Sequence, residues 1–114
     1  IGTVRDNHEG KSVSAVTYDA FEPLAAKVLG EIAAEAASRF GARVAAEHRM
    51  GRLAVGEASV AIAAGSPHRE AAFGACRWVI EAIKRRLPVW KREHYLDGES
   101  AWLPGCSLGH SDRP

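Results

Sequence analysis

Residues 59–91 read SVAIAAGSPHREAAFGACRWVIEAIKRRLPVWK. The run from Ser59 to Ala64 is short and largely apolar, which predicts a buried strand. Ser66 and Pro67 predict the start of a helix, with Ser66 as the N-cap and Pro67 at the first helical position, where its missing N–H costs nothing. Pro88 ends this helix, and the chain after it is expected to be extended.

The flanking sequence predicts a second helix and further strands. Residues 13–18 alternate as a half-buried strand does, and residues 3–5 are expected to pair with them in a hairpin with a basic, mobile loop. A helix runs from Pro23 to a C-cap at Gly41. The remaining expected elements are a strand over 43–48, a turn-rich segment over 50–56 and a hairpin over 95–103. The order β-β-α-β-β-α-β predicts an α+β fold, with two helices packed on one mixed or antiparallel sheet.

Length and composition indicate an ordinary globular chain. Its 114 residues, 46% hydrophobic and 25% charged, predict a single domain over 1–114. The first five residues look like the end of a strand, so an N-terminal strand is expected to be missing, and residues 104–114 are expected to be irregular. Seven of the fifteen Lys and Arg residues fall between Arg69 and Arg92, although the net charge is only +1. This concentration favours a small anionic ligand over nucleic acid.

Other classes of protein and site lack support in the sequence. There is no apolar run of membrane-spanning length and no signal-peptide pattern. The two cysteines form no paired framework, and the five histidines show no zinc spacing. We therefore expect a cytoplasmic protein with no metal, no cofactor and no membrane association.

The helix after Pro67 presents a candidate reactive lysine. Its expected apolar face comprises Ala72, Phe73, Cys76, Val79, Ile80, Ile83 and Leu87. Lys84 falls at the edge of that face, with Arg77 almost above it along the helix. Lost hydration and a neighbouring cation would both lower the pKa of Lys84, as a nucleophile or general base requires. The alternative is a lysine whose stem covers apolar surface while its ammonium stays in water.

Two further basic segments are candidates for anion binding. His68 and Arg69 lie in the first turn of the expected helix, where free backbone N–H groups favour phosphate. The alternative is that both pair with Glu70 or another segment. Lys91 and Arg92 follow the helix in an extended segment and would leave it on opposite faces.

Together these segments resemble the large subunit of the molybdopterin synthase family. The resemblance rests on motifs in the family's order and spacing: GTVRD at 2–6, HRMGRL at 48–53, VGE at 55–57, SPHR at 66–69, AF at 72–73 and PVWKRE at 88–93. It implies an α/β hammerhead-like fold with a small extra antiparallel β subdomain. It also implies a sulfurtransferase that converts cyclic pyranopterin monophosphate to molybdopterin by adding two dithiolene sulfurs.

The resemblance also implies partners and site residues. The sulfur donor would be the thiocarboxylated C-terminus of a small ubiquitin-like subunit, and the large subunit would form a homodimer within a heterotetramer. Lys84 and Lys91 would be catalytic. Substrate binding is assigned to Arg5, His68 and Arg69, with Arg5 contributed across the dimer. Arg77 and Arg92 are further substrate-binding candidates. An arginine that family members often carry after the Trp102 region is absent from 103–106, and Arg113 is a weak replacement.

Two alternatives to the enzyme remain. One is a non-catalytic module that binds a nucleotide or RNA through the same cations, although aromatic residues are not interleaved with the basic cluster as stacking platforms are. The other is a structural subunit with an inactive site.

Overall fold

The computed structural model describes residues 1–104, and the expectation of an irregular tail falls on residues outside that range. The helices are α1 (Glu22–Phe40) and α2 (Arg69–Arg86). The strands are β1 (Gly2–Thr3), β2 (Asn7–His8), β3 (Lys11–Asp19), β4 (Arg43–His48), β5 (Gly51–Ala54), β6 (Ala58–Gly65), β7 (Trp90–Tyr95) and β8 (Ser100–Pro104). No helix within residues 1–104 has the length and apolar character needed to cross a membrane.

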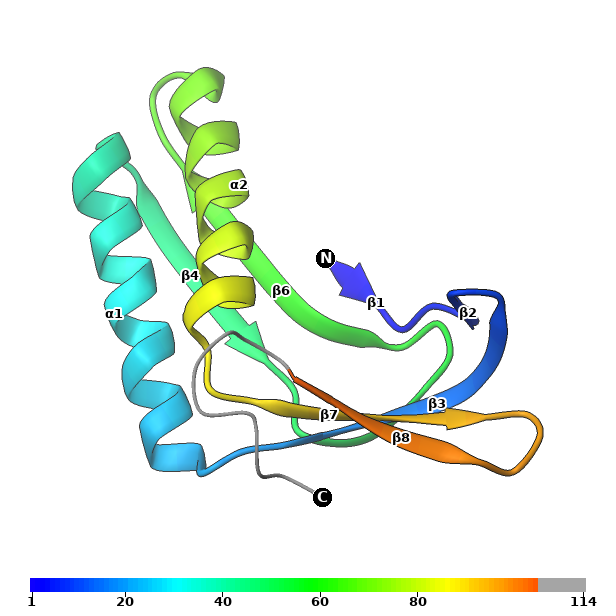
Figure 1. The fold of residues 1–114 in the computed structure, drawn as a ribbon. Coiled ribbons are helices and arrows are strands. Elements are labelled where there is room, and N and C mark those ends of the chain that lie inside the picture. The colour runs from blue at the N-terminus through cyan, green and yellow to red at the C-terminus, as the bar shows by residue number, and fades with distance from the viewer. Residues whose placement is uncertain (105–114) are drawn as a thin grey trace.

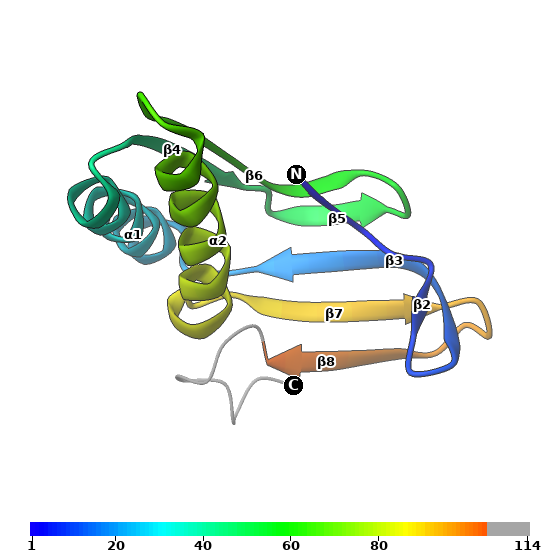
Figure 2. The ribbon, with the colours of Figure 1, turned by 90° about the horizontal axis from the view of Figure 1, so that it is seen from above.

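The strands form two antiparallel sheets. The first has the order β1-β6-β4, and both helices pack beside it (Figure 1). The second has the order β2-β3-β7-β8, with β5 also paired to β3, and projects away from the helices (Figure 2). This arrangement confirms the expected α+β class with an additional antiparallel β subdomain.

Each sheet has its own hydrophobic core. The first core lies between the helices and β6, and comprises Ala25, Ile32, Ala36, Val60, Val79, Ala82, Ile83, Leu87 and Val89. The second lies on the inner face of the β subdomain and comprises Val4, Val13, Val16 and Leu53. Burial of these apolar side chains drives both halves to fold.

Several predicted elements are confirmed. β4 has the predicted bounds, and β7 and β8 form the expected hairpin around Gly98, which has φ of 89°. Helix α1 ends where Gly41 adopts a left-handed conformation with φ of 61°, and the Gly41 N–H donates to the Ala37 carbonyl. Glycine takes this conformation without the steric cost that a side chain brings.

Two predictions about strands were wrong. The expected hairpin of 3–5 with 13–18 is replaced by a shorter one, β2 with β3, because β1 pairs with β6 and the Val4 N–H donates to the Glu57 carbonyl. The segment over 50–56 is not only a turn, since β5 pairs with β3. Leu53, 1% exposed, anchors β5 in the second core.

The start and the buried face of α2 also differ from the prediction. The N-cap is His68 rather than Ser66, because the Ser66 hydroxyl accepts the His68 N–H at 3.4 Å and holds a turn ahead of the helix. The buried residues are Ala75, Val79, Ala82 and Ile83, whereas Phe73 is 75% exposed. The buried face is therefore rotated away from Phe73, and Lys84 lies in solvent rather than at the edge of the core.

Candidate functional site

Lys91 is a partly buried amine. It lies on the inner face of β7, opposite Tyr18 of β3, and its side chain is 28% exposed. Burial lowers the pKa of Lys91, and the nearby charges of Arg5 and Lys84 lower it further, while Glu93 opposes them. A lowered pKa raises the fraction of neutral amine near pH 7, as base or nucleophile chemistry requires. Lys84, which the sequence placed at the edge of the core, is exposed in the structure.

Three distant segments bring their cations together around Lys91. Arg5 comes from the chain between β1 and β2, Lys84 from the last turn of α2, and Lys91 from β7. Arg5 and Lys84 are close enough to change the pKa of Lys91 within one chain. Arg5 therefore lies near the lysines of its own chain, and a second protomer is not needed to supply it. Clustered cations of this kind suit a small anionic ligand.

A short buried connector sets the separation of the two lysines. Leu87 is 0% exposed and Val89 is 6% exposed, so the chain is anchored on both sides of Pro88. The Leu87 N–H donates to the Ile83 carbonyl, and the Val89 N–H donates to the Leu87 carbonyl at 2.9 Å. The end of α2 and the start of β7 are thus rigidly joined.

Glu93, a buried carboxylate beside Lys91, was not among the site residues predicted from the sequence. Glu93 is 3% exposed, and its Oε2 lies 3.9 Å from Lys91 Nζ and 3.6 Å from His8 Nδ1. The Tyr95 hydroxyl donates to the other oxygen, Oε1, at 3.0 Å. Its position two residues after Lys91 in a strand, hence on the same face, was the available signal.

Tyr18 was also missed, and it links the two sheets beside Lys91. Burial raises the pKa of its hydroxyl, while a hydrogen bond with Ser59 of β6 and the charge of Arg5 lower it. Its ring also meets the ring of His48 edge-on, with centroids 4.8 Å apart. Tyr18 therefore fixes β3 against the first sheet at the level of the lysines.

His68 and Arg69 lie at the opposite end of α2 from Lys84. A rise of about 1.5 Å per residue separates Arg69 from Lys84 by about 22 Å along the helix. Both side chains are exposed and line a polar hollow with Ser66 and Pro67. Within residues 1–104 neither forms an ion pair, so the alternative of pairing with Glu70 is not what the structure shows. Within a single chain, His68 and Arg69 therefore do not share a site with Lys84 and Lys91.

The remaining two candidates have partners of their own. The side chain of Arg77 is 85% exposed, and its Nε lies 3.0 Å from Glu81 Oε1. Side chains alternate between the two faces of a strand, so Arg92 leaves β7 on the face opposite Lys91. In the pairing of β7 with β3, Arg92 lies opposite Thr17. Its guanidinium donates to the Ser100 hydroxyl at 2.9 and 2.7 Å and lies 5.7 Å from the centroid of the Trp102 ring. The side-chain partners of Arg77 and Arg92 are therefore residues other than Lys91.

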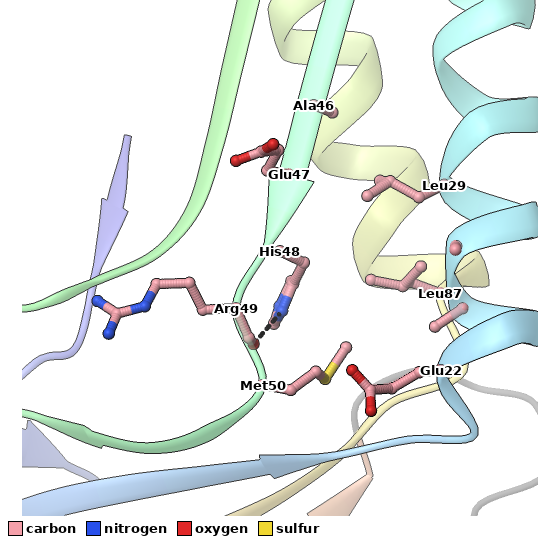
Figure 3. A pocket seen from close by; sticks show the side chains of 10 residues that line it. Glu22, Leu29, Ala46, Glu47, His48, Arg49, Met50 and Leu87 are labelled. Carbon is pink, nitrogen blue, oxygen red and sulfur yellow. Dashed lines mark hydrogen bonds between the residues drawn. The ribbon is translucent and has the colours of Figure 1, made fainter.

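A separate apolar cavity of about 310 Å³ lies between α1 and the end of β4 (Figure 3). It is lined by Glu22, Ala25, Ala26, Leu29, Ala46, Glu47, His48, Arg49, Met50 and Leu87. Burial lowers the pKa of His48, whose Nδ1 lies 2.8 Å from the Arg49 carbonyl oxygen. None of the basic candidate residues lines this cavity.

The fold and the lysine cluster define an α+β protein with a cationic site at the junction of two antiparallel sheets. Residues 1–86 match the family model described as MoaE protein, and the chain belongs to the MoaE family. It is 47% identical over 110 residues to the molybdopterin synthase catalytic subunit of Synechococcus elongatus, covering 95% of this chain and 67% of that protein. It is 46% identical over 104 residues to the catalytic subunit of Bacillus subtilis, covering 90% of this chain and 66% of that protein. The chain thus spans about two thirds of the length of these relatives.

Solved structures agree with this assignment. The crystal structure of molybdopterin synthase from Staphylococcus aureus superposes with a TM-score of 0.84 at 36% identity, covering 90% of this chain and 74% of that chain. The MoaE protein of Burkholderia ambifaria gives a TM-score of 0.76 at 36% identity, covering 95% of this chain and 70% of that chain.

Proposed function

We propose that this chain is the catalytic part of a sulfurtransferase that converts cyclic pyranopterin monophosphate to molybdopterin. The sulfur comes from the thiocarboxylated C-terminus of a small ubiquitin-like subunit. Each transfer breaks the C–S bond of one thiocarboxylate, and water supplies the oxygen that turns its acyl carbon into a carboxylate on the small subunit. In the same transfer a side-chain carbon of the pterin forms a C–S bond and loses a C–O bond. Two successive transfers make the dithiolene, and the cyclic phosphate opens.

One observation carries this proposal: Lys91 is a partly buried amine with a lowered pKa, flanked by Lys84 and Arg5. The neutral form of Lys91 is suited to accept a proton, and its protonated form to stabilise charge on the opening ring. Lys84 is exposed at the end of α2, so it is accessible to an incoming thiocarboxylate. Arg5 adds a permanent positive charge for the phosphate.

We further propose that a second copy of the chain completes the site. His68 and Arg69 are exposed, have no ion-pair partner within residues 1–104 and stand far from the lysines of their own chain. If they bind the same phosphate as Arg5, they must come from the other protomer of a homodimer. Such a dimer would form the centre of a heterotetramer that carries one small subunit on each side. Residues 1–114 would act as one domain of a cytoplasmic enzyme.

The decisive experiment mixes the protein with thiocarboxylated small subunit and cyclic pyranopterin monophosphate, and detects the dithiolene product by mass spectrometry. Wild-type protein should form product, whereas Lys91→Ala and Lys84→Ala should form none and keep the wild-type circular dichroism spectrum. Lys27→Ala is the matched control, because Lys27 is an exposed lysine of α1 outside the cluster. Normal turnover by both lysine variants would refute the assignment.

A further inference from the structure

Helix α2 has one flank that no other helix covers. Trp78 faces α1, where the Arg39 guanidinium lies 5.1 Å from the centroid of its ring. Phe73 lies about 140° around the helix from Trp78, and it is 75% exposed. Within residues 1–104 no helix lies on this side of α2, which we call the open flank (Figure 2). A single chain therefore leaves a large aromatic side chain in water.

An apolar hollow of about 390 Å³ lies beside Phe73, between the open flank and the strands β6 and β1. Val60 and Ile62 of β6 and Ile80 of α2 contribute apolar walls, and Arg77 is the charged residue of its lining. A lone exposed apolar side chain is common on protein surfaces, whereas a contiguous apolar patch marks an interaction site. Phe73 and this hollow together form such a patch.

The spacing of this patch allows it to pair with a copy of itself. Phe73 and Ile80 are seven residues apart, which is about 10.5 Å along α2 and about 20° around it. If a second α2 lies antiparallel on the open flank, each Phe73 meets the partner's Ile80 and fills the partner's hollow. A surface on which residue i contacts residue j, and j contacts i, is what a twofold dimer requires.

The same pairing brings the start of one α2 to the lysine end of the other. Arg69 precedes Phe73 by four residues. Lys84 follows Ile80 by the same interval. These four side chains lie within about 60° around the helix, so they share the open flank. In the antiparallel pair, Arg69 therefore lies beside the partner's Lys84.

Charge alone does not hold two open flanks together. Arg69, Arg77 and Lys84 are the cations of the flank. The Arg77 Nε lies 3.0 Å from Glu81 Oε1, so this charge is matched within its own helix. Glu70, in the first turn of α2, adds one carboxylate next to Arg69. Apolar contact therefore has to supply the association, as it does in the core of a homodimer interface.

Basic groups are in excess where the two helix ends meet. They comprise Arg5, Lys84 and Lys91 of one chain with His68 and Arg69 of the other. The carboxylates that oppose them are Glu93 of the first chain and Glu70 of the second. An anion bound among these groups offsets their repulsion, so binding of the anion and formation of the dimer are linked.

We propose that the open flank of α2 joins two copies of this chain, with the helices antiparallel and Phe73 of each copy in the hollow of the other. Arg69 of one copy then completes the lysine site of its partner, and an anion bound there strengthens the dimer. The inference rests on the proposed function for the use of the shared site, but the contact itself can be tested without sulfur transfer.

Sedimentation velocity of the full chain tests the contact. Wild-type protein should sediment as a dimer, and Phe73→Asp as a monomer with the wild-type circular dichroism spectrum, because Phe73 is exposed in the single chain. Leu96→Asp is the matched control, since Leu96 is 72% exposed in the turn after β7, away from α2 (Figure 1). It should remain dimeric. A monomeric wild type, or a dimeric Phe73→Asp, would overturn the proposal.

Disulfide formation tests the antiparallel orientation. In a background of Cys76→Ala and Cys106→Ala, the variants Phe73→Cys and Ile80→Cys are oxidised separately and as an equal mixture. The mixture should give a linked dimer that contains one chain of each variant. Neither variant alone should link, because equivalent positions are about 10.5 Å apart along the helices and a disulfide spans at most about 7 Å between Cα atoms. Linked dimers of Phe73→Cys alone would indicate another orientation and refute the proposal.

Inorganic phosphate tests the link between the anion and the dimer. At a phosphate concentration equal to its dissociation constant for one site, two sites should tighten the dimer about fourfold. Dilution of fluorescently labelled protein measures this change against chloride of equal ionic strength. Arg69→Ala should abolish the tightening, whereas Arg43→Ala, at an exposed position of β4, should retain it. No tightening in wild-type protein would contradict the shared anion site.

These measurements separate the dimer contact from the proposed function. Absence of dithiolene product from a protein that passes all three tests would refute the sulfurtransferase and leave the contact in place. Normal product formation by monomeric Phe73→Asp would instead refute the shared site and leave the sulfurtransferase in place.

Discussion

Lys91 and Glu93 lie on the same face of β7, with Lys91 Nζ 3.9 Å from Oε2 of the carboxylate. Burial is the larger influence on the amine and lowers its pKa, while the charge of Glu93 raises it. The carboxylate thus holds the lysine in place and at the same time moderates the loss of its proton.

Glu93→Gln should lower the pKa of Lys91 further, because it removes the charge that favours the ammonium and leaves burial unchanged. The pKa can be read from the pH dependence of ¹³C signals after reductive methylation of the lysines. In wild-type protein the signal of Lys91 should titrate below the ordinary lysine value of 10.5, and the difference should grow in Glu93→Gln. A Lys91 midpoint at 10.5 would contradict the burial of Lys91.

Subunit complementation should reveal a site shared between two protomers. Arg69→Ala and Lys91→Ala should each be inactive as pure proteins. After the two variants are mixed and exchange subunits, half the dimers carry one intact site of two, so product formation should recover to about one quarter of wild type. No recovery, despite confirmed exchange, would show that Arg69 and Lys91 do not serve one site across the dimer.

Leu53→Ala should destabilise the β subdomain by about 2 to 5 kcal/mol, since it removes a buried side chain from the second core. Val55→Ala, in the turn after β5, is the matched control, because Val55 is 40% exposed. Its effect should stay within about 0.5 kcal/mol. Urea denaturation followed by circular dichroism measures both, and equal effects would contradict the packing of Leu53.

His48 should make the protein sensitive to acid. Burial lowers its pKa from 6.5, so the unfolded chain takes up this proton at a higher pH than the folded chain does. The free energy of unfolding should therefore fall as pH drops from about 6.5 toward the lower folded pKa. His48→Gln should reduce that decline between pH 7 and 5. Denaturation curves across this pH range decide the matter.

The sequence predicted the main elements of the fold because their signals are local. Pro23 and Gly41 mark the ends of α1, and Gly98 marks the last hairpin. The pairing of β1 with β6 rather than with β3 was not predictable, because it depends on contacts between residues distant along the chain. The same limit explains the rotated face of α2, since periodicity does not reveal that Phe73 is 75% exposed.

The site was predicted in part for similar reasons. The motif resemblance pointed to both lysines, yet the desolvated one is Lys91, because tertiary contacts rather than helical spacing decide burial. Glu93 was overlooked because the sequence does not show that a carboxylate in a basic segment lies 3% exposed.

The buried connector between α2 and β7 has a consequence for how this protein can vary. Leu87 and Val89 are buried and anchor the chain between Lys84 and Lys91, so they fix the separation of the two lysines. Inserting or deleting one residue there would turn the helix tip by about 100° or send the alternating side chains of the strand to the wrong face. Length changes should therefore be rare at this joint and common at the exposed turn around Gly98, where no reactive group depends on the spacing.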